Sequence, residues 1–144
     1  MDKFKLREQL KIDEGVKLTV YLDSVGLPTV GVGHLVLNKD KLKLGDTITM
    51  ERCDSLLESD MNVSLQNCGK LFPKFEVMPE NIQQVIANMM FNMGLYRLSG
   101  FKKFIAALLA KNYSLAADEM KNSKWYTQVG KRAQRLEKKI RETK

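Results

Sequence analysis

Two carboxylic acids and one hydroxyl lie close together near the start of the chain, at Glu14, Asp23 and Thr29. Glycosidic bond cleavage needs two carboxyl groups, because one must be protonated to assist the leaving oxygen while the other stays ionised beside the developing positive charge. A nearby hydroxyl can hold the attacking water. The spacing alone is more typical of a helix-end glutamate, a turn aspartate and a strand threonine, so the catalytic interpretation needs further support.

The elements that would position these residues follow from the surrounding pattern. Residues 4–14 predict a helix with an imperfect apolar stripe of Phe4, Leu6, Leu10 and Ile12, which Gly15 can end. The β-rich runs KLTVYLD and PTVGVGH are separated by turn residues and predict a hairpin. Gly31 and Gly33 alternate with valines, so one face of the second strand lacks side chains and lets a backbone or a ligand come close.

The remainder of the chain is expected to be helical. Thr49 is a plausible N-cap for a helix over residues 50–69 that buries Leu56, Leu57, Met61, Val63 and Leu65. Cys53 and Cys68 would lie about 22 Å apart on this helix, which is beyond disulfide reach and suits a reducing cytosol. Pro79 is expected in the first turn of an apolar helix that Gly94 closes. Further helices are predicted near 100–111, 114–122 and 131–142, with Trp125-Tyr126 between the last two.

These elements predict an α+β, mainly α, fold in a single domain of residues 1–144. A small β-rich lobe, about 15–48, would be inserted in a helical lobe of residues 1–14 and 50–144, with a ligand cleft between the lobes. No apolar run is long enough for a membrane span, and the charged N-terminus is unlike a signal peptide. We therefore expect neither an export signal nor a membrane anchor.

The charge of the chain is strongly asymmetric. Residues 1–72 have a net charge of −1, whereas residues 73–144 carry 14 Lys and Arg against 6 Asp and Glu, a net charge of +8. A basic half of this kind favours a polyanionic partner, which could be a nucleic acid, an anionic membrane surface or a cell-wall polymer. No helix-turn-helix or zinc pattern supports nucleic-acid binding. With one histidine and two distant cysteines, we expect no metal site and no cofactor.

The full string around the first three residues, IDEG…YLD…GLPTVGVGH, resembles the catalytic signature of the phage-type lysozymes of glycoside hydrolase family 24. The resemblance continues in ITMERCDSLLESDM, ANMMFNMG and SKWYTQVGKRAQRL, in the same order and over nearly the whole chain. It implies a lysozyme-like fold and hydrolysis of the β-1,4 bond between N-acetylmuramic acid and N-acetylglucosamine in peptidoglycan. The segment between His34 and Thr49 is shorter than in the T-even phage enzymes, which implies a more open cleft rim.

Residue by residue, the resemblance implies that Glu14 is the general acid and that Asp23 and Thr29 position the attacking water. Arg132 matches an arginine that pairs with the catalytic glutamate, and His34 matches a histidine whose ion-pair partner here would be Asp60. That match favours a structural role for His34 over a catalytic one. The matching substrate-binding positions are Gly33, Leu35, Phe91 and Asn92. Pattern alone would place Phe91 and its methionine neighbours in the core.

The resemblance also implies partners and a location. A phage endolysin of this kind would accumulate in the cytoplasm of the infected host until a holin gives it access to peptidoglycan in the periplasm. A monomer is the default expectation for the oligomeric state. The alternative function is a non-hydrolytic cationic relative that binds the wall or perturbs membranes through residues 131–144. Leu136 and Ile140 give that segment only a narrow apolar stripe.

Overall fold

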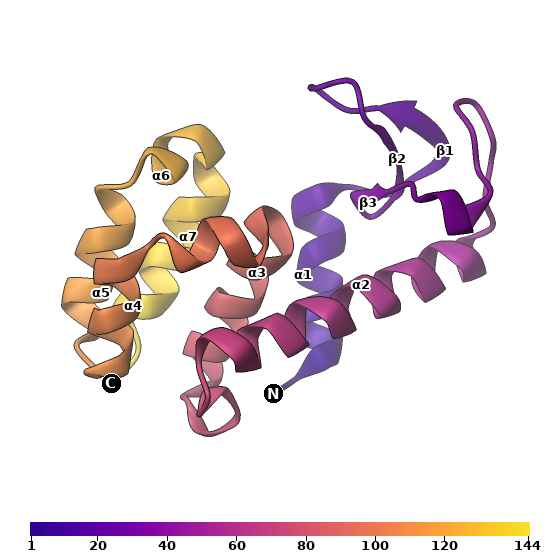
Figure 1. The fold of residues 1–144 in the computed structure, drawn as a ribbon. Coiled ribbons are helices and arrows are strands. Elements are labelled where there is room, and N and C mark those ends of the chain that lie inside the picture. The colour runs from indigo at the N-terminus through magenta and orange to yellow at the C-terminus, as the bar shows by residue number, and fades with distance from the viewer. The chain divides into compact units, whose positions relative to one another are not determined.

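The computed structural model describes all 144 residues as two compact units. The first unit, residues 2–63, holds the only sheet, and the second unit consists of Met1 and residues 64–144. We call them the N-terminal unit and the C-terminal unit. Seven α-helices and one three-stranded antiparallel sheet confirm the expected α+β, mainly α, fold (Figure 1).

The N-terminal unit begins with helix α1 (Lys3–Glu14). The Asp2 side chain accepts a hydrogen bond from the amide of Lys5 at 3.0 Å, which caps the first turn. Gly15 ends the helix as predicted, with φ of 77° and its amide donating to the carbonyl of Lys11. The predicted apolar stripe is only half right, because Leu6 and Leu10 are buried whereas Phe4 and Ile12 are 66% and 76% exposed.

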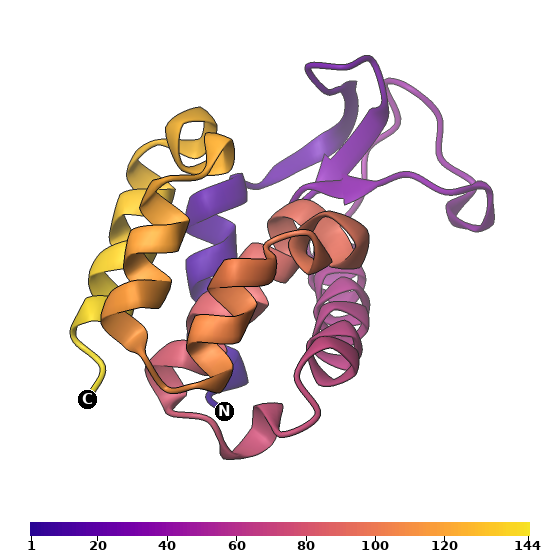
Figure 2. The ribbon, with the colours of Figure 1, turned by 60° about the vertical axis from the view of Figure 1, so that its left-hand side comes forward.

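The sheet follows directly from the end of α1 (Figure 2). It consists of β1 (Lys17–Leu22), β2 (Pro28–Gly31) and β3 (His34–Leu35), paired in that order. The predicted hairpin is present between β1 and β2, but the single strand expected over PTVGVGH was wrong. Gly31 and Gly33 have φ of 68° and 64°, a backbone region that favours glycine, and the chain turns back there to form β3.

Helix α2 (Met50–Leu71) contributes residues to both units. It follows a short 3-10 turn, η1 (Asn38–Asp40), and the Thr49 hydroxyl accepts from the amide of Arg52 at 3.1 Å, which confirms the predicted N-cap. The prediction for its buried face needs correction. Leu57 and Met61 are buried, but Val63 is 55% exposed and Leu56 and Leu65 are partly exposed. The two cysteines complete the buried face instead, and both are free thiols.

The C-terminal unit is built around helix α3 (Glu80–Ser99), preceded by the 3-10 turn η2 (Phe75–Val77). Pro79 occupies the N-cap position, one residue before the helix. Gly94 interrupts the helix with φ of 80° and ψ of 169°, so the predicted end is a kink, after which a last helical turn follows. Every residue from Ile82 to Met90 is buried, as expected for a central helix.

Four shorter helices complete this unit: α4 (Lys102–Leu109), α5 (Tyr113–Lys121), α6 (Lys124–Val129) and α7 (Lys131–Arg141). Helix α5 contacts both α4 and α7, and α7 also contacts α3 and α6. Helix α6 was not predicted as a helix. It is short, and the Ser123 hydroxyl caps it by accepting from the amide of Tyr126. No helix is both long and apolar enough to span a bilayer.

Candidate active site

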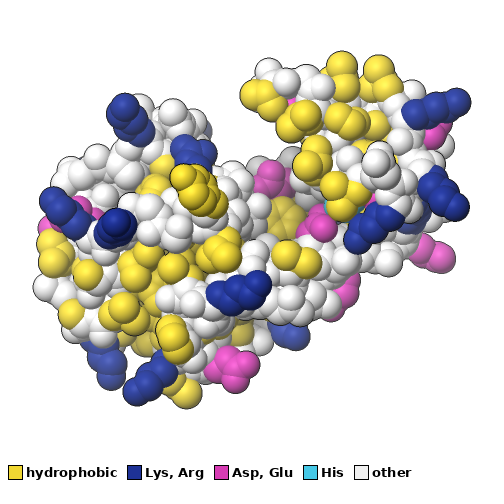
Figure 3. All heavy atoms as spheres, viewed as in Figure 1, with side chains coloured by type: hydrophobic (Ala, Val, Ile, Leu, Met, Phe, Trp, Pro, Cys, Tyr) yellow, Lys and Arg dark blue, Asp and Glu magenta, His cyan; other side chains and the backbone are white.

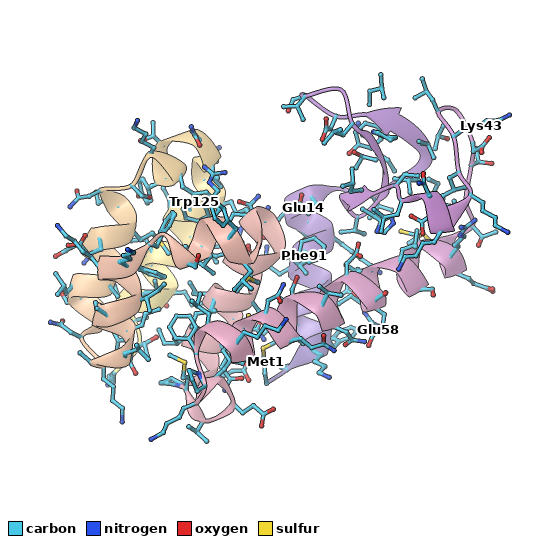
Figure 4. The ribbon with its side chains drawn as sticks, in the orientation of Figure 1. Met1, Glu14, Lys43, Glu58, Phe91 and Trp125 are labelled. Atoms are coloured by element: carbon cyan, nitrogen blue, oxygen red, sulfur yellow. The ribbon has the colours of Figure 1, made fainter.

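Glu14 is the last residue of α1, at the end that leads into β1 (Figure 4). Its carboxyl group lies against the backbone of the turn between β2 and β3. A Cβ atom placed on Gly33 would stand 3.0 Å from Glu14 Oε1 and 3.4 Å from the carboxyl carbon. The sequence predicted that a backbone or a ligand would come close to the glycine-rich segment, whereas the group that lies close to Gly33 is the side chain of the predicted acid.

Asp23 begins the turn between β1 and β2. Its Oδ1 atom accepts hydrogen bonds from the amides of Val25 at 2.9 Å and Leu27 at 2.8 Å. Its own amide donates to the carbonyl of Leu27, and the amide of Gly26 donates to the carbonyl of Asp23. Two hydrogen bonds thus hold the carboxylate through Oδ1 and two backbone bonds close the turn, while Oδ2 takes part in none of the four.

Thr29 lies on β2 and is 6% exposed. Its hydroxyl donates to the carbonyl of Leu27 at 3.0 Å. Because the hydroxyl proton is committed to that carbonyl, the oxygen presents its lone pairs as an acceptor. Leu27 therefore connects the two predicted water-positioning residues, with its amide on Asp23 and its carbonyl on Thr29.

The register of the sheet places the side chain of Thr29 in a row with the side chains of two neighbouring strands. Thr29 pairs with Tyr21 on β1 and with Leu35 on β3, so the three side chains share one face of the sheet. Leu35 is 46% exposed, which leaves an apolar surface next to the threonine hydroxyl. Val30 and His34 pair on the opposite face, and both are buried.

His34 is held between two carboxylates. Its Nδ1 lies 2.7 Å from Asp60 Oδ2, the partner expected from the resemblance, and its Nε2 lies 2.8 Å from Asp40 Oδ2. The hydrogen bond to Asp60 raises the pKa of His34 more than burial lowers it, and Asp40 raises it further. With both ring nitrogens engaged, the imidazole ties β3 to η1 and α2.

Asp40 was missed in the sequence, where it is one charged residue in a polar connection. Its carboxylate also accepts from the amide of Leu37 at 2.7 Å, and its carbonyl accepts from the guanidinium of Arg52 at 2.6 Å. Burial opposes its ionisation, but the bonds from Leu37 and His34 outweigh burial and lower the pKa of Asp40. These bonds anchor the short connection that precedes α2.

In the C-terminal unit, Phe91 and Asn92 are neighbours on α3 (Figure 4). Phe91 is partly exposed, so it is not the fully buried core residue that pattern alone suggests. The Asn92 side chain accepts a hydrogen bond from Trp125 Nε1 at 2.8 Å. Trp125 is 2% exposed and makes an edge contact with Phe101. One predicted substrate-binding residue thus also satisfies a buried indole.

Arg132, near the start of α7, donates from Nε to the Asn88 side chain at 2.8 Å. Asn88 is buried on α3, so the bond joins the basic terminal helix to the central helix of the same unit. The pairing of Arg132 with Glu14 stays a prediction. No group of three or more His, Cys, Asp or Glu side chains has the arrangement of a metal site.

Known proteins resemble this chain over most of its length. The family model for phage lysozyme matches residues 11–143. Probable T4-type lysozyme 2 of Dictyostelium discoideum is 35% identical over an alignment of 153 positions, which covers 91% of this chain and 90% of that protein. The endolysin of Salmonella phage P22 is 34% identical over 113 residues, covering 76% of this chain and 74% of the endolysin.

A further relative is part of a larger assembly protein. The pre-baseplate central spike protein Gp5 of Enterobacteria phage T4 is 30% identical over an alignment of 152 positions, which covers 91% of this chain but 26% of Gp5. The match to the family model spans far more than half of the sequence, and two of these relatives are covered over most of their own length. The chain belongs to the phage lysozyme family and is a lysozyme-type hydrolase of the bacterial cell wall.

Proposed function

We propose that this lysozyme cleaves the β-1,4 bond between N-acetylmuramic acid and N-acetylglucosamine in peptidoglycan. The observation that carries the proposal is the connection through Leu27, which fixes a carboxylate and a hydroxyl as hydrogen-bond acceptors in the same unit as Glu14. Two fixed acceptors can orient one water molecule, because a water has two protons to donate. An acid on a separate element can then serve the leaving group.

In this mechanism Glu14 donates its proton to the glycosidic oxygen as the bond from the anomeric carbon to that oxygen breaks. The water held by Asp23 and Thr29 adds to the anomeric carbon, and its proton passes to the carboxylate of Asp23. Atoms and charge balance, since one water is consumed and each sugar fragment gains a hydroxyl. The carboxylate also stabilises the positive charge that develops on the sugar ring.

Substrate contacts are proposed at Gly33, Leu35, Phe91 and Asn92. Gly33 leaves backbone accessible where a larger residue would meet Glu14, and Leu35 offers an exposed apolar surface beside Thr29. Aromatic and apolar side chains are the usual lining of a ligand site, with a few polar groups that fix orientation. We further propose that Arg132 pairs with Glu14 and positions the acid.

The charge of the C-terminal half supports a polyanionic substrate. Residues 73–144 carry a net charge of +8, and attraction to an anionic wall raises the local enzyme concentration at low ionic strength. Activity on intact walls is therefore expected to fall as salt rises. Activity on a short neutral oligosaccharide should change far less, which separates attraction to the wall from the chemical step.

The alternative function, killing without hydrolysis through residues 131–144, has less support. The apolar stripe of α7 consists of Ala133, Leu136 and Ile140, and all three are buried in the C-terminal unit. A membrane-active helix would need this stripe exposed. If the alternative were right, a Glu14→Gln variant would still permeabilise cells while releasing no sugar ends.

The test of bond specificity is the chemical identity of the ends released from purified peptidoglycan. Reduction of the products with labelled borohydride, followed by acid hydrolysis, should place the label on muramic acid derivatives. Label on glucosamine derivatives would instead indicate cleavage of the other glycosidic bond. Loss of reducing ends altogether, with a non-reducing anhydro product, would mean that water is not the attacking group.

Location and the need for a holin are proposed from the family, and the monomer is the default oligomeric state. We propose that the protein accumulates as a monomer in the host cytoplasm and requires a holin to reach the wall. Expression in a bacterium without a holin should leave the culture intact until the inner membrane is permeabilised with chloroform. Lysis without permeabilisation would contradict this proposal, and sedimentation analysis of the purified protein tests the monomer.

A further inference from the structure

A cavity of about 600 Å³ opens in the C-terminal unit, and none of its lining residues belongs to the proposed active site. The surface of its lining is more apolar than polar. Phe72 and Leu108, each 1% exposed, belong to the buried core behind it, and Met78 adds a partly exposed wall. Val77 and Leu109 stand at the surface with 80% and 58% exposure. The volume lies in the range of small-molecule sites, and exposed apolar residues around such a space are typical of binding surfaces.

The same cavity has a cationic border. Lys74, Lys111 and Lys144 line it, and all three are exposed. No Asp or Glu lines the cavity, and none of these three lysines forms a salt bridge with an Asp or Glu side chain. Ammonium groups with no carboxylate side chain in the same lining favour an anion at this border.

A second cavity, of about 430 Å³, continues the site on its polar side. It shares Lys111, Tyr113 and Lys144 with the first and adds Asn112 and Arg141, again with no acidic residue in its lining. Arg141 is paired with Asp118 at 2.8 Å, so its charge is largely compensated. An apolar space therefore passes into a polar space of positive charge, and the lysines lie where the two meet.

The backbone fixes Lys111 at this junction. It lies in the turn between α4 and α5 with φ of 57°, and its amide donates to the carbonyl of Leu108 at 3.0 Å. The following residue, Asn112, donates from its amide to the carbonyl of Ala107 and caps α5 through its side chain. Figure 3 shows hydrophobic and basic side chains gathered at the lower left, over the η2 segment and the turn from α4 to α5.

We propose that this pair of cavities binds a single-chain anionic amphiphile, with its alkyl chain in the larger cavity and its anionic head at Lys111. An anionic amphiphile can contact both the apolar lining and the lysines, whereas other ligand classes would use only one of the two. A small hydrophilic anion would leave the apolar interior unfilled, and a neutral hydrocarbon would leave the lysines without a counter-charge. The proposal does not depend on the hydrolytic function.

The test is isothermal titration calorimetry of the full chain at low salt with dodecyl phosphate, below its micelle-forming concentration. One equivalent should bind. Each buried methylene changes affinity by about fourfold, so octyl phosphate should bind at least about tenfold more weakly even if its chain is only partly buried. Inorganic phosphate and dodecyl maltoside should bind much more weakly than dodecyl phosphate.

Two surface variants locate the site. Leu109→Asp adds a charge to the apolar wall and Lys111→Glu reverses the charge at the junction, and each should weaken dodecyl phosphate binding at least about tenfold. Lys124→Glu is the matched control, because Lys124 is exposed and lines neither cavity. It should bind as the wild type does. All three variants should retain wall hydrolysis, so loss of binding and loss of catalysis can be told apart.

Several results would overturn the proposal: equal binding of inorganic phosphate, equal binding of dodecyl maltoside, or unchanged affinity in both site variants. Vesicles distinguish the source of the amphiphile. Co-sedimentation with phosphatidylglycerol vesicles that Leu109→Asp abolishes would indicate that the site takes a lipid from a bilayer. Binding of monomeric dodecyl phosphate without vesicle binding would indicate a free amphiphile, whereas vesicle binding without dodecyl phosphate binding would contradict the proposed site.

Discussion

The side chains of Asp23 and Thr29 are both hydrogen-bonded to the backbone of Leu27. The Leu27 amide donates to the Asp23 carboxylate at 2.8 Å, and the Leu27 carbonyl accepts from the Thr29 hydroxyl at 3.0 Å. The turn that shapes the hairpin is therefore also the device that orders both predicted water-positioning groups. A change in either side chain can be designed to keep the turn while altering the acceptor.

Asp23→Asn is such a change. The amide oxygen can still accept from Val25 and Leu27, so the free energy of unfolding should change by less than about 1 kcal/mol. The charge beside the sugar is lost, and kcat should fall by about 100-fold or more. Denaturant unfolding and release of reducing ends measure the two effects. Near-wild-type kcat in a folded variant would remove Asp23 from the mechanism.

Gly33→Ala should displace the carboxyl group of Glu14. Gly33 has φ of 64°, and a Cβ atom there would lie 3.0 Å from Glu14 Oε1. Gly26→Ala is the matched control, because Gly26 has φ of 83° but open space around a Cβ atom. Both variants should lose about 1–2 kcal/mol of stability from backbone strain. Only Gly33→Ala should also lower kcat, and equal kcat values would show that this contact does not position the acid.

The buried histidine predicts a pH dependence of stability with a defined sign. The pKa of His34 is raised above its ordinary value of 6.5, so its contribution is fully present below about pH 6.5 and is lost as the pH rises through the raised value. The pKa of Asp40 is lowered from 3.8, so its contribution is present above about pH 3.8 and is lost as the pH falls through the lowered value.

Asp40→Asn should flatten the alkaline part of this profile, because the protonated imidazole loses one of its two carboxylate partners. The variant should also lose about 2 kcal/mol near pH 5, where a charged hydrogen bond becomes a neutral one. Urea unfolding between pH 4 and pH 9 measures both effects. A wild-type profile with no decline above neutral pH would contradict the arrangement around His34.

Asn92 accepts a hydrogen bond from Trp125, and this structural role can be tested separately from its proposed role in substrate binding. Asn92→Ala leaves the buried Nε1 of Trp125 without its acceptor and should cost about 1–3 kcal/mol. Trp125 is the only tryptophan, so its fluorescence reports this site alone. Asn92→Asp keeps an acceptor and should restore most of the stability. Unchanged stability in Asn92→Ala would mean that the bond to Trp125 contributes nothing.

The sequence predicted the helices and strands that carry the site better than it predicted which of their faces are buried. Gly15 and Thr49 act as the expected helix boundaries because capping depends on local chemistry. The face of α2 was misjudged because hydrophobicity ranks Val63 above Cys53, whereas the burial of a position depends on what packs against it. Helix α6 was missed because six residues give too little periodicity to detect.

In the site, too, features that depend on local sequence were predicted and features that depend on packing were not. The positions of Glu14, Asp23 and Thr29 came from a local string, and the turn that orders the last two is local as well. Gly31 and Gly33 were interpreted as a bare strand face, because alternation with valine is a strand pattern until their positive φ is known. Asp40 has no signal in the sequence, since its bond to His34 depends on where η1 lies.

The most direct test of the proposed chemistry is the release of reducing ends from purified Gram-negative peptidoglycan by the wild type, Glu14→Gln and Glu8→Gln. Glu8 is exposed on the same helix as Glu14, so the control removes the same charge from α1. We predict that Glu8→Gln matches the wild type and that Glu14→Gln, still folded and still bound to the wall, releases at least about 1,000-fold fewer ends. Release by Glu14→Gln at the wild-type rate would contradict the assignment of Glu14 as the general acid.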